Sequence, residues 1–338
     1  MLDATANGIN LWLTKVFPSL FPFMVACNIL LLTGAAERFS FYFRPFTKIL
    51  FGLEGIAAFP FFLGILSGYP MGAKITAQLY KKNNISLSEA QHILAFSNNP
   101  GPLFLIGTIG AGFFHMPVYG YLLWFCSFLG AVLTGILWRF RKKKNTSKSM
   151  SCHFSTIPVS TADVFSSSVS DAVQTILLIG GYLILFSAFS EALEQTGICC
   201  LLSKALFFLP ISLDHLHGCI SGLLEMTNGA YLLSPDPDTL PLVAFLVSFG
   251  GLSILSQTFG ILAAVPISKK DYLKGKILHA LFSSLFVALF FPFLERNAQK
   301  AVPVFSFFTE TAFTLSFLWL MPSLFCFGVI CYTIIVRK

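Results

Sequence analysis

One broken apolar stretch constrains the fold of this chain more than any other feature. The run from Ile56 to Leu66 is too long for a loop and too short to cross a bilayer as a helix. The sequence Ser67-Gly-Tyr-Pro-Met-Gly-Ala-Lys74 follows, and its two glycines and one proline end any helix there. Backbone that leaves a helix at membrane depth is tolerated only where protein or a water-filled cavity surrounds it. The stretch therefore predicts the tip of a helical hairpin inside a membrane protein.

The same pattern returns in the second half of the chain. Residues 64–73 and residues 218–230 both begin with Gly-x-x-Ser-Gly and end with Gly-Ala, and the second copy has three extra residues. Two broken segments at corresponding places in two halves are the sequence feature that best indicates the binding site of a transporter.

The composition agrees with a membrane protein. Of the 338 residues, 55% are hydrophobic and only 11% are charged, far from the usage of soluble domains. We expect an all-α polytopic membrane protein with about seven full spans and two re-entrant, broken-helix hairpins. The expected spans lie near residues 12–33, 92–114, 117–139, 171–193, 240–266, 276–294 and 311–336, and the hairpins near 56–78 and 217–234.

The basic residues orient the chain. If the N-terminus is outside and each hairpin returns to the side it came from, most of the 22 Lys and Arg residues fall inside, among them those of the expected Lys269–Lys276 loop. The net charge of +7 then reflects topology rather than nucleic-acid binding. Each half has a span that ends in Thr-Gly, a hairpin and two more spans, which is an odd number of crossings. The halves are therefore predicted to form inverted-topology repeats.

This reading divides the chain into four parts. A first membrane repeat at 1–138 is followed by a basic, Ser/Thr-rich cytoplasmic linker at 139–170. The second, inverted repeat takes 171–294, and the remainder, 295–338, carries an extra C-terminal span that has no counterpart in the first repeat.

Two charged residues in the hairpins are candidates for a site. Lys74 is predicted to attract an anionic substrate, or else to extend its ammonium group to the inner membrane surface. Glu225 is its counterpart in the second hairpin. It could pair with Lys74, carry a proton or bind a cation, or it could lie at an exposed hairpin tip.

The spans that follow the hairpins are also interrupted by polar residues. Ser97-Asn-Asn-Pro-Gly-Pro102 unwinds the first, and its asparagines either cap the resumed helix or form an anion site with the freed amides. Residues 248–257 hold the corresponding polar group in the second half. The predicted substrate-binding residues are Ser67, Tyr69, Lys74, Asn98, Asn99, Ser221, Glu225, Thr227, Asn228, Ser253 and Gln257.

Enzyme chemistry has no positive support in the sequence. It contains no Ser/His/Asp arrangement, no phosphate-binding Gly-Lys-Ser/Thr and no Cys-x-x-Cys. Asp214-His215-Leu-His217 lacks a third metal ligand and is read as an anchor at the membrane interface. We expect no enzymatic activity, no metal and no cofactor.

Three motifs together resemble a known family. Val16-Phe-Pro-Ser-Leu-Phe-Pro-Phe23, the stretch from Gly64 to Lys74, and Phe96-Ser-Asn-Asn-Pro-Gly-Pro102 are similar to the sporulation integral membrane proteins of the YlbJ type. Each half also resembles the gate, or nucleoside recognition, domain shared with concentrative nucleoside transporters. The resemblance implies a protein of the outer forespore membrane of endospore-forming bacteria. It also implies that the substrate is dipicolinic acid, moved from the mother cell toward the forespore.

The function hypotheses come from different classes. A transporter of a small organic anion suits the residues, because Lys74 and the amides fit carboxylates and Tyr69 could stack on a ring. The alternatives are a non-transporting membrane scaffold of a sporulation complex and a transporter of a nucleoside-like solute. A scaffold needs no unwound backbone at depth, which favours transport. The expected partners are the small anion and the lipid bilayer, with no nucleic acid, and a homo-oligomer stays open.

Overall fold

The computed structural model describes residues 2–33, 35–141, 161–205 and 212–298, and within them every element is a helix. The predicted final span at 311–336 lies outside this part of the chain. The elements in chain order are α1 (Leu2–Leu11), η1 (Trp12–Val16), α2 (Phe17–Leu32), α3 (Ala35–Phe51), η2 (Gly55–Ala57), α4 (Ala58–Ser67), α5 (Met71–Lys81), α6 (Leu87–Ser97), η3 (Leu103–Phe113), α7 (Pro117–Arg141), α8 (Thr161–Gln195), α9 (Ile198–Ala205), α10 (Leu213–Leu224), α11 (Met226–Leu233), η4 (Pro237–Thr239), α12 (Leu240–Phe249), α13 (Gly251–Leu262) and α14 (Lys269–Ala298).

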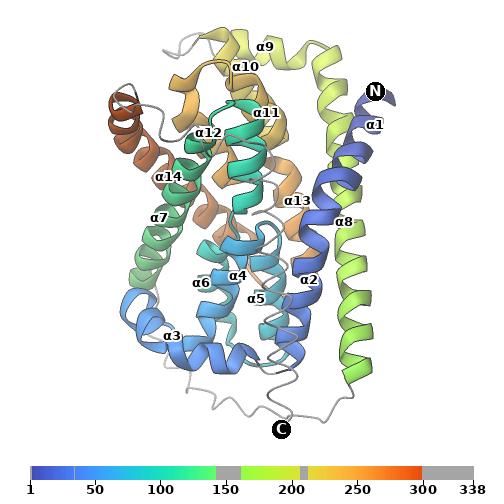
Figure 1. The fold of residues 1–338 in the computed structure, drawn as a ribbon, viewed down its shortest axis with the longest axis vertical. Helices are drawn as coiled ribbons and strands as arrows, with labels where there is room; N and C mark the ends of the chain where they lie inside the picture. The colour runs from blue at the N-terminus through green and yellow to red at the C-terminus, as the bar shows by residue number, and fades with distance from the viewer. Residues whose placement is uncertain (1, 34, 142–160, 206–211, 299–338) are drawn as a thin grey trace.

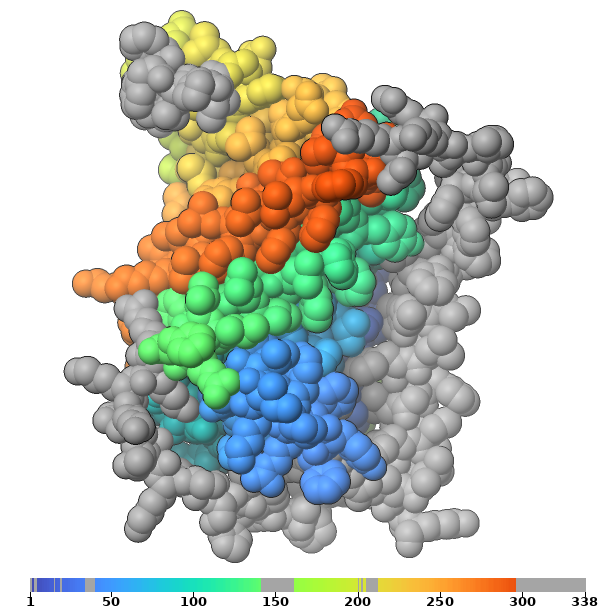
Figure 2. Space-filling model, turned by 90° about the vertical axis from the view of Figure 1, so that its left-hand side faces the viewer, coloured from blue at the N-terminus to red at the C-terminus, as the bar shows by residue number. Residues whose placement is uncertain are grey.

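Long apolar helices frame the molecule. By length and composition, four helical stretches of the described chain could cross a membrane, at Pro117–Phe140, Thr161–Gln195, Pro237–Leu262 and Lys269–Glu295. A fifth is obtained if α3 and α4, which meet at a 90° bend, are taken as one span. In Figure 1, α8 runs along most of the long axis, and α7 and α14 lie obliquely on the opposite side. Figure 2 shows α14, α7 and α3 as adjacent bands on one face.

Two helical hairpins lie between these long helices. In the first, α4 packs against α5, and in the second α10 packs against α11. Figure 1 shows the first hairpin in the lower half of the molecule and the second in the upper half. It also shows α3 lying across the lower end and α9 across the upper end. The hairpins therefore occupy opposite halves of the fold.

Local sequence explains where the helices around the hairpins begin and end. Ser86 and Glu89 form a reciprocal capping box at the start of α6. That helix stops at Ser97 because Pro100 and Pro102 cannot continue it. The apolar core consists of one large cluster around α2, α4, α5 and α6 and a second around η3, α7, α12 and α14.

The structure differs from the predicted elements in several places. It contains α3, where the sequence analysis predicted neither a span nor a hairpin, and Pro45 lies inside this helix. The linker expected at 139–170 is partly helical, since α7 continues to Arg141 and α8 begins at Thr161. The prediction of a loop at Lys269–Lys276 is wrong, because these residues form the first turns of α14. The number of helices that qualify as spans by length is also lower than expected, since two of the expected spans are broken or short apolar helices.

Candidate functional site

The tip of the first hairpin is pressed against the break that ends α6. A Cβ atom placed on Gly64 or on Gly72 would collide with the backbone oxygen of Ser97. At the turn itself, a Cβ on Gly68 would lie 2.8 Å from the backbone nitrogen of Gly101. The glycines predicted to end the helix therefore also let its backbone touch the unwound residues of α6 directly.

The second hairpin has a comparable arrangement. Its two helices approach so closely that a Cβ on Gly229 would collide with the Cα of Gly222. The predicted break at 248–257 is present between α12 and α13, where Gly250 and Gly251 have φ values of +93° and +65°. A Cβ on Gly251 would lie 3.0 Å from the backbone oxygen of Gly222, so this break touches the second hairpin.

The two tips are joined by one small apolar cluster. It contains Tyr69 from the first tip, Met226 from the second and Ile254 from α13, with Phe104 packed against them. The Tyr69 hydroxyl donates hydrogen bonds to the backbone oxygens of Ser248 at 2.8 Å and Val247 at 3.1 Å. Tyr69 therefore connects the first hairpin to the end of α12, directly before the second break.

A lysine that the sequence reading placed in a cytoplasmic loop lies at this junction. Lys276 is only 1% exposed, and its ammonium donates to the Tyr69 hydroxyl at 2.8 Å and to the backbone oxygen of Asn98 at 2.9 Å. A longer contact of 3.3 Å joins it to Nδ1 of His279. The tautomer with a proton on Nε2 of His279 fits, because that atom can donate to the backbone oxygen of Ser127 at 2.9 Å. We call Tyr69, Asn98, Lys276 and His279 the Lys276 cluster.

A sequence signal could have found this cluster. Tyr272, Lys276, His279 and Ser283 follow one another at intervals of three and four residues, which is the spacing of one helix face. All of them are buried in α14. A polar stripe inside an otherwise apolar helix indicates a face that packs against protein. The stripe was missed because Lys276 was counted with the basic residues that precede it.

The asparagines of the α6 break contribute both satisfied and unsatisfied groups. The Asn98 amide donates to Oγ1 of Thr258 at 3.1 Å and to the Tyr272 hydroxyl at 2.8 Å, and the Asn99 amide donates to the Phe96 backbone oxygen at 2.9 Å. The side-chain oxygens of both asparagines are buried and have no hydrogen-bond partner within the described residues, and neither does that of Gln257. Buried oxygens of this kind are normally hydrogen-bonded. A water molecule or a solute could donate the hydrogen bond that the described residues do not.

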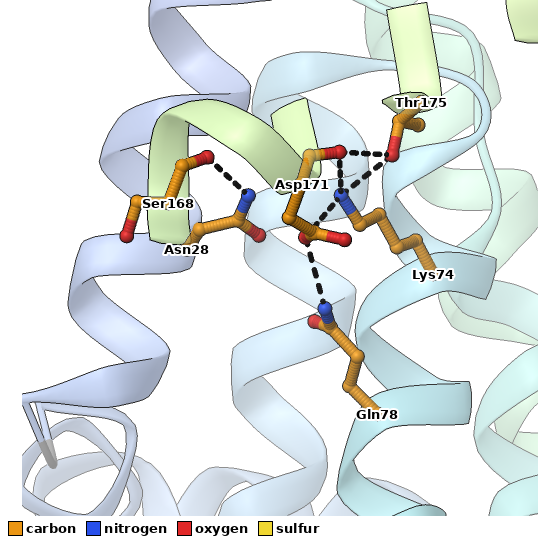
Figure 3. A network of polar contacts seen from close by, with 6 residues as sticks. All are labelled: Asn28, Lys74, Gln78, Ser168, Asp171 and Thr175. Carbon is orange, nitrogen blue, oxygen red and sulfur yellow. Dashed lines mark hydrogen bonds and ion pairs between the residues drawn. The ribbon is translucent and has the colours of Figure 1, made fainter. Parts of the chain in front are cut away.

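Lys74 belongs to a different network, which Figure 3 shows. Its ammonium lies 2.7 Å from Oδ2 of Asp171 and donates to Oγ1 of Thr175 at 2.7 Å. Gln78 donates to the same carboxylate oxygen at 3.3 Å. The ammonium therefore does not extend to the surface, as one reading had it, but fastens the first hairpin to α8. Its predicted role in anion binding stays a prediction, although its charge is already matched by Asp171.

Glu225 caps the second helix of its hairpin. The residue is only 8% exposed, and its carboxylate accepts hydrogen bonds from the backbone nitrogen of Asn228 at 2.9 Å and from the Thr227 hydroxyl at 3.0 Å. The reading of an exposed tip is therefore wrong. The pairing with Lys74 is also wrong for this structure, because the ion pair of Lys74 is made with Asp171.

The remaining predicted residues are spread over the junction. Ser67, Ser221 and Ser253 are buried, Thr227 is half-buried and Asn228 is exposed. The structure thus brings Tyr69 and Asn98 together with Lys276, places Thr227 and Asn228 beside Glu225, and leaves Lys74 in its own network with α8.

The cap supplies a testable prediction. We expect Glu225→Ala to lower the free energy of unfolding by about 1–2 kcal/mol, because the first turn of α11 loses its acceptor. Glu225→Gln should lose less, since its amide oxygen can still accept from the Asn228 backbone. Thermal unfolding of the purified protein in detergent measures both. Equal losses in the two variants would mean that the carboxylate charge, rather than the cap, is what the site requires.

Comparisons with known proteins bear on the family and the fold. The family described as "Gate: Nucleoside recognition" matches residues 13–114. Two solved structures share the fold at 15% sequence identity and cover 85% of this chain. One is a variant of CNTnw in an intermediate state, with a TM-score of 0.54 and 84% of that chain covered. The other is CNTnw in an inward-facing substrate-bound state, with a TM-score of 0.50 and 82% covered.

A curated relative resembles the chain at the level of sequence. Over 314 residues the chain is 31% identical to the "Sporulation integral membrane protein YlbJ" of Bacillus subtilis (strain 168), and the match covers 85% of this chain and 76% of the relative. Together with the apolar helices, this makes the chain an integral membrane protein. The three motifs that suggested the family lie in η1–α2, in the first hairpin and in the α6 break, and the chain belongs to the family of the sporulation integral membrane protein YlbJ.

Proposed function

We propose that the protein is a membrane transporter whose solute binds between the two hairpin tips and the two helix breaks. The observation that carries the proposal is the convergence of these four interruptions on one buried polar junction. Broken helices that meet in the interior supply helix ends and free backbone groups to a solute, which is how many secondary transporters build their sites. A scaffold would have no use for such a junction, so the scaffold reading is the weaker one.

The two repeats are part of the proposal. The position of the hairpins in opposite halves of the fold supports inverted-topology repeats at 1–138 and 171–294, with both hairpins re-entrant (Figure 1). On this reading the linker at 139–170 is cytoplasmic and the segment at 295–338 is an addition to the repeats. The outer forespore membrane, which the family resemblance implies, is part of the same proposal.

For the solute, we propose a small organic anion, with dipicolinate as the leading case. The choice comes from what the family resemblance implies, and the curated relative is itself described as a sporulation protein. The helix that resumes after Pro102 adds an N-terminal end near the junction, where backbone amides and the helix dipole favour negative charge.

A nucleoside-like solute is the second candidate. The buried side-chain oxygens of Asn98, Asn99 and Gln257 favour it, because they would accept hydrogen bonds from the N–H and O–H groups of such a molecule. The match to the gate family points the same way.

Uptake into vesicles that contain only this protein tests the proposal. We expect radiolabelled dipicolinate to enter these vesicles faster than protein-free vesicles, and uridine to enter both at the same rate. Faster entry of uridine alone would favour the second candidate. If neither solute enters faster in either orientation of the gradient, the transport proposal fails and the scaffold reading replaces it.

A further inference from the structure

The charge of Lys276 is not balanced inside the described part of the protein. Its three contacts are a tyrosine hydroxyl, a backbone oxygen and an imidazole nitrogen, which satisfy its hydrogen bonds but carry no negative charge. An ammonium removed from water is costly unless an anion compensates it. No Asp or Glu of the described chain forms an ion pair with it.

The other buried charges of the described residues differ in this respect. The buried charged side chains there are Lys74, Glu225 and Lys276. Lys74 has a carboxylate at 2.7 Å, and Glu225 receives hydrogen bonds from the first turn of α11. Of these three, only Lys276 has neutral partners. A negatively charged group from outside the described chain would compensate its positive charge.

Lys276 directly contacts two of the four interruptions. It binds the first hairpin tip through Tyr69 and the α6 break through the Asn98 backbone. Tyr69 in turn bonds to Ser248 at the end of α12, and the ammonium lies 4.8 Å from the centre of the Tyr69 ring. A group held by Lys276 would therefore be held where the two halves of the molecule meet.

We propose that Lys276 is the residue that holds the negatively charged group of the solute, an inference that rests on the proposed transport function. The contact to His279 is the longest of its three, so a carboxylate oxygen can replace it and leave the bonds to Tyr69 and Asn98 intact. His279 would keep its bond to Ser127 through Nε2. The solute's charge then neutralises the ammonium, and a bond between two charged groups replaces a longer bond to a neutral imidazole.

Binding of dipicolinate to the purified protein in detergent tests the assignment. We expect Lys276→Met to weaken this binding by about tenfold or more, because one partner of a buried charge pair is removed. Lys276→Arg should retain part of the affinity. Lys274→Met is the matched control, since Lys274 lies on the same helix but is exposed, and it should bind as the unmodified protein does.

A second measurement needs no variant. The neutral diamide of dipicolinic acid has nearly the same shape without the charge, and it should compete with dipicolinate much more weakly. Equal competition by the diamide, or undiminished binding by a folded Lys276→Met variant, would overturn the assignment while leaving a transporter in place. If the unmodified protein binds neither dipicolinate nor uridine, the proposed function fails first and the role of Lys276 falls with it.

Discussion

Replacing Gly72 with alanine is expected to lower the free energy of unfolding by about 3 kcal/mol, because one added methyl group overfills a tightly packed contact. The Cβ of the new residue would collide with the Ser97 backbone oxygen and would lie 2.5 Å from the Ser97 backbone carbon. A flexible side chain could turn away, but these atoms are backbone and belong to the break that α6 makes at this point. The hairpin tip must then separate from the break, and transport should be lost together with stability.

Chemical unfolding in mixed micelles measures this effect, and the chain offers a matched control. Gly181 lies inside α8, and beyond its chain neighbours and the nearby backbone of that helix no atom lies within 4 Å of its added Cβ. Gly181→Ala should therefore leave stability unchanged or raise it by up to about 1 kcal/mol, since alanine favours helix more than glycine does. If Gly72→Ala were as stable as Gly181→Ala, the close packing of the first tip against α6 would be wrong.

Asp171→Ala is expected to lower the free energy of unfolding by about 2–3 kcal/mol, because it leaves the Lys74 ammonium buried without a counter-charge. The side chain of Lys74 is 7% exposed, whereas that of Asp171 is 43% exposed. The opposite change is therefore milder. Lys74→Met should cost about 1 kcal/mol or less, because the remaining carboxylate can be solvated and the methionine fills the space of the lysine stem. The order of the two variants follows from which partner is left buried.

The double variant completes the test. With no ammonium present, loss of the carboxylate should matter little, so Lys74→Met combined with Asp171→Ala should be about as stable as Lys74→Met alone. Simple addition of the two single effects would mean that the pair is not coupled. The same three variants also test the predicted anion-binding role of Lys74, since normal dipicolinate uptake by a folded Lys74→Met protein would exclude it.

The interruptions of the helices could be predicted from sequence because glycine and proline act on their own backbone. Gly68 and Pro70 end α4, Pro100 and Pro102 end α6, and Gly250 with Gly251 separates α12 from α13. In each case the cause lies within a few residues of the effect. The same rule does not hold at α3, because Pro45 lies inside that helix and does not end it.

The partners of the polar side chains were decided by the tertiary structure. Lys74 and Glu225 looked equivalent in the two hairpins, but one pairs with Asp171, 97 positions away, and the other bonds to residues of its own turn. Lys276 stands among basic residues in the sequence, and only the packing of α14 against α6 and the first hairpin makes it the buried cation of the junction. A local pattern sets where a helix ends because φ and ψ are local quantities. The presence or absence of a counter-charge depends on residues that are distant in the chain. Only the folded structure brings those residues within hydrogen-bonding distance.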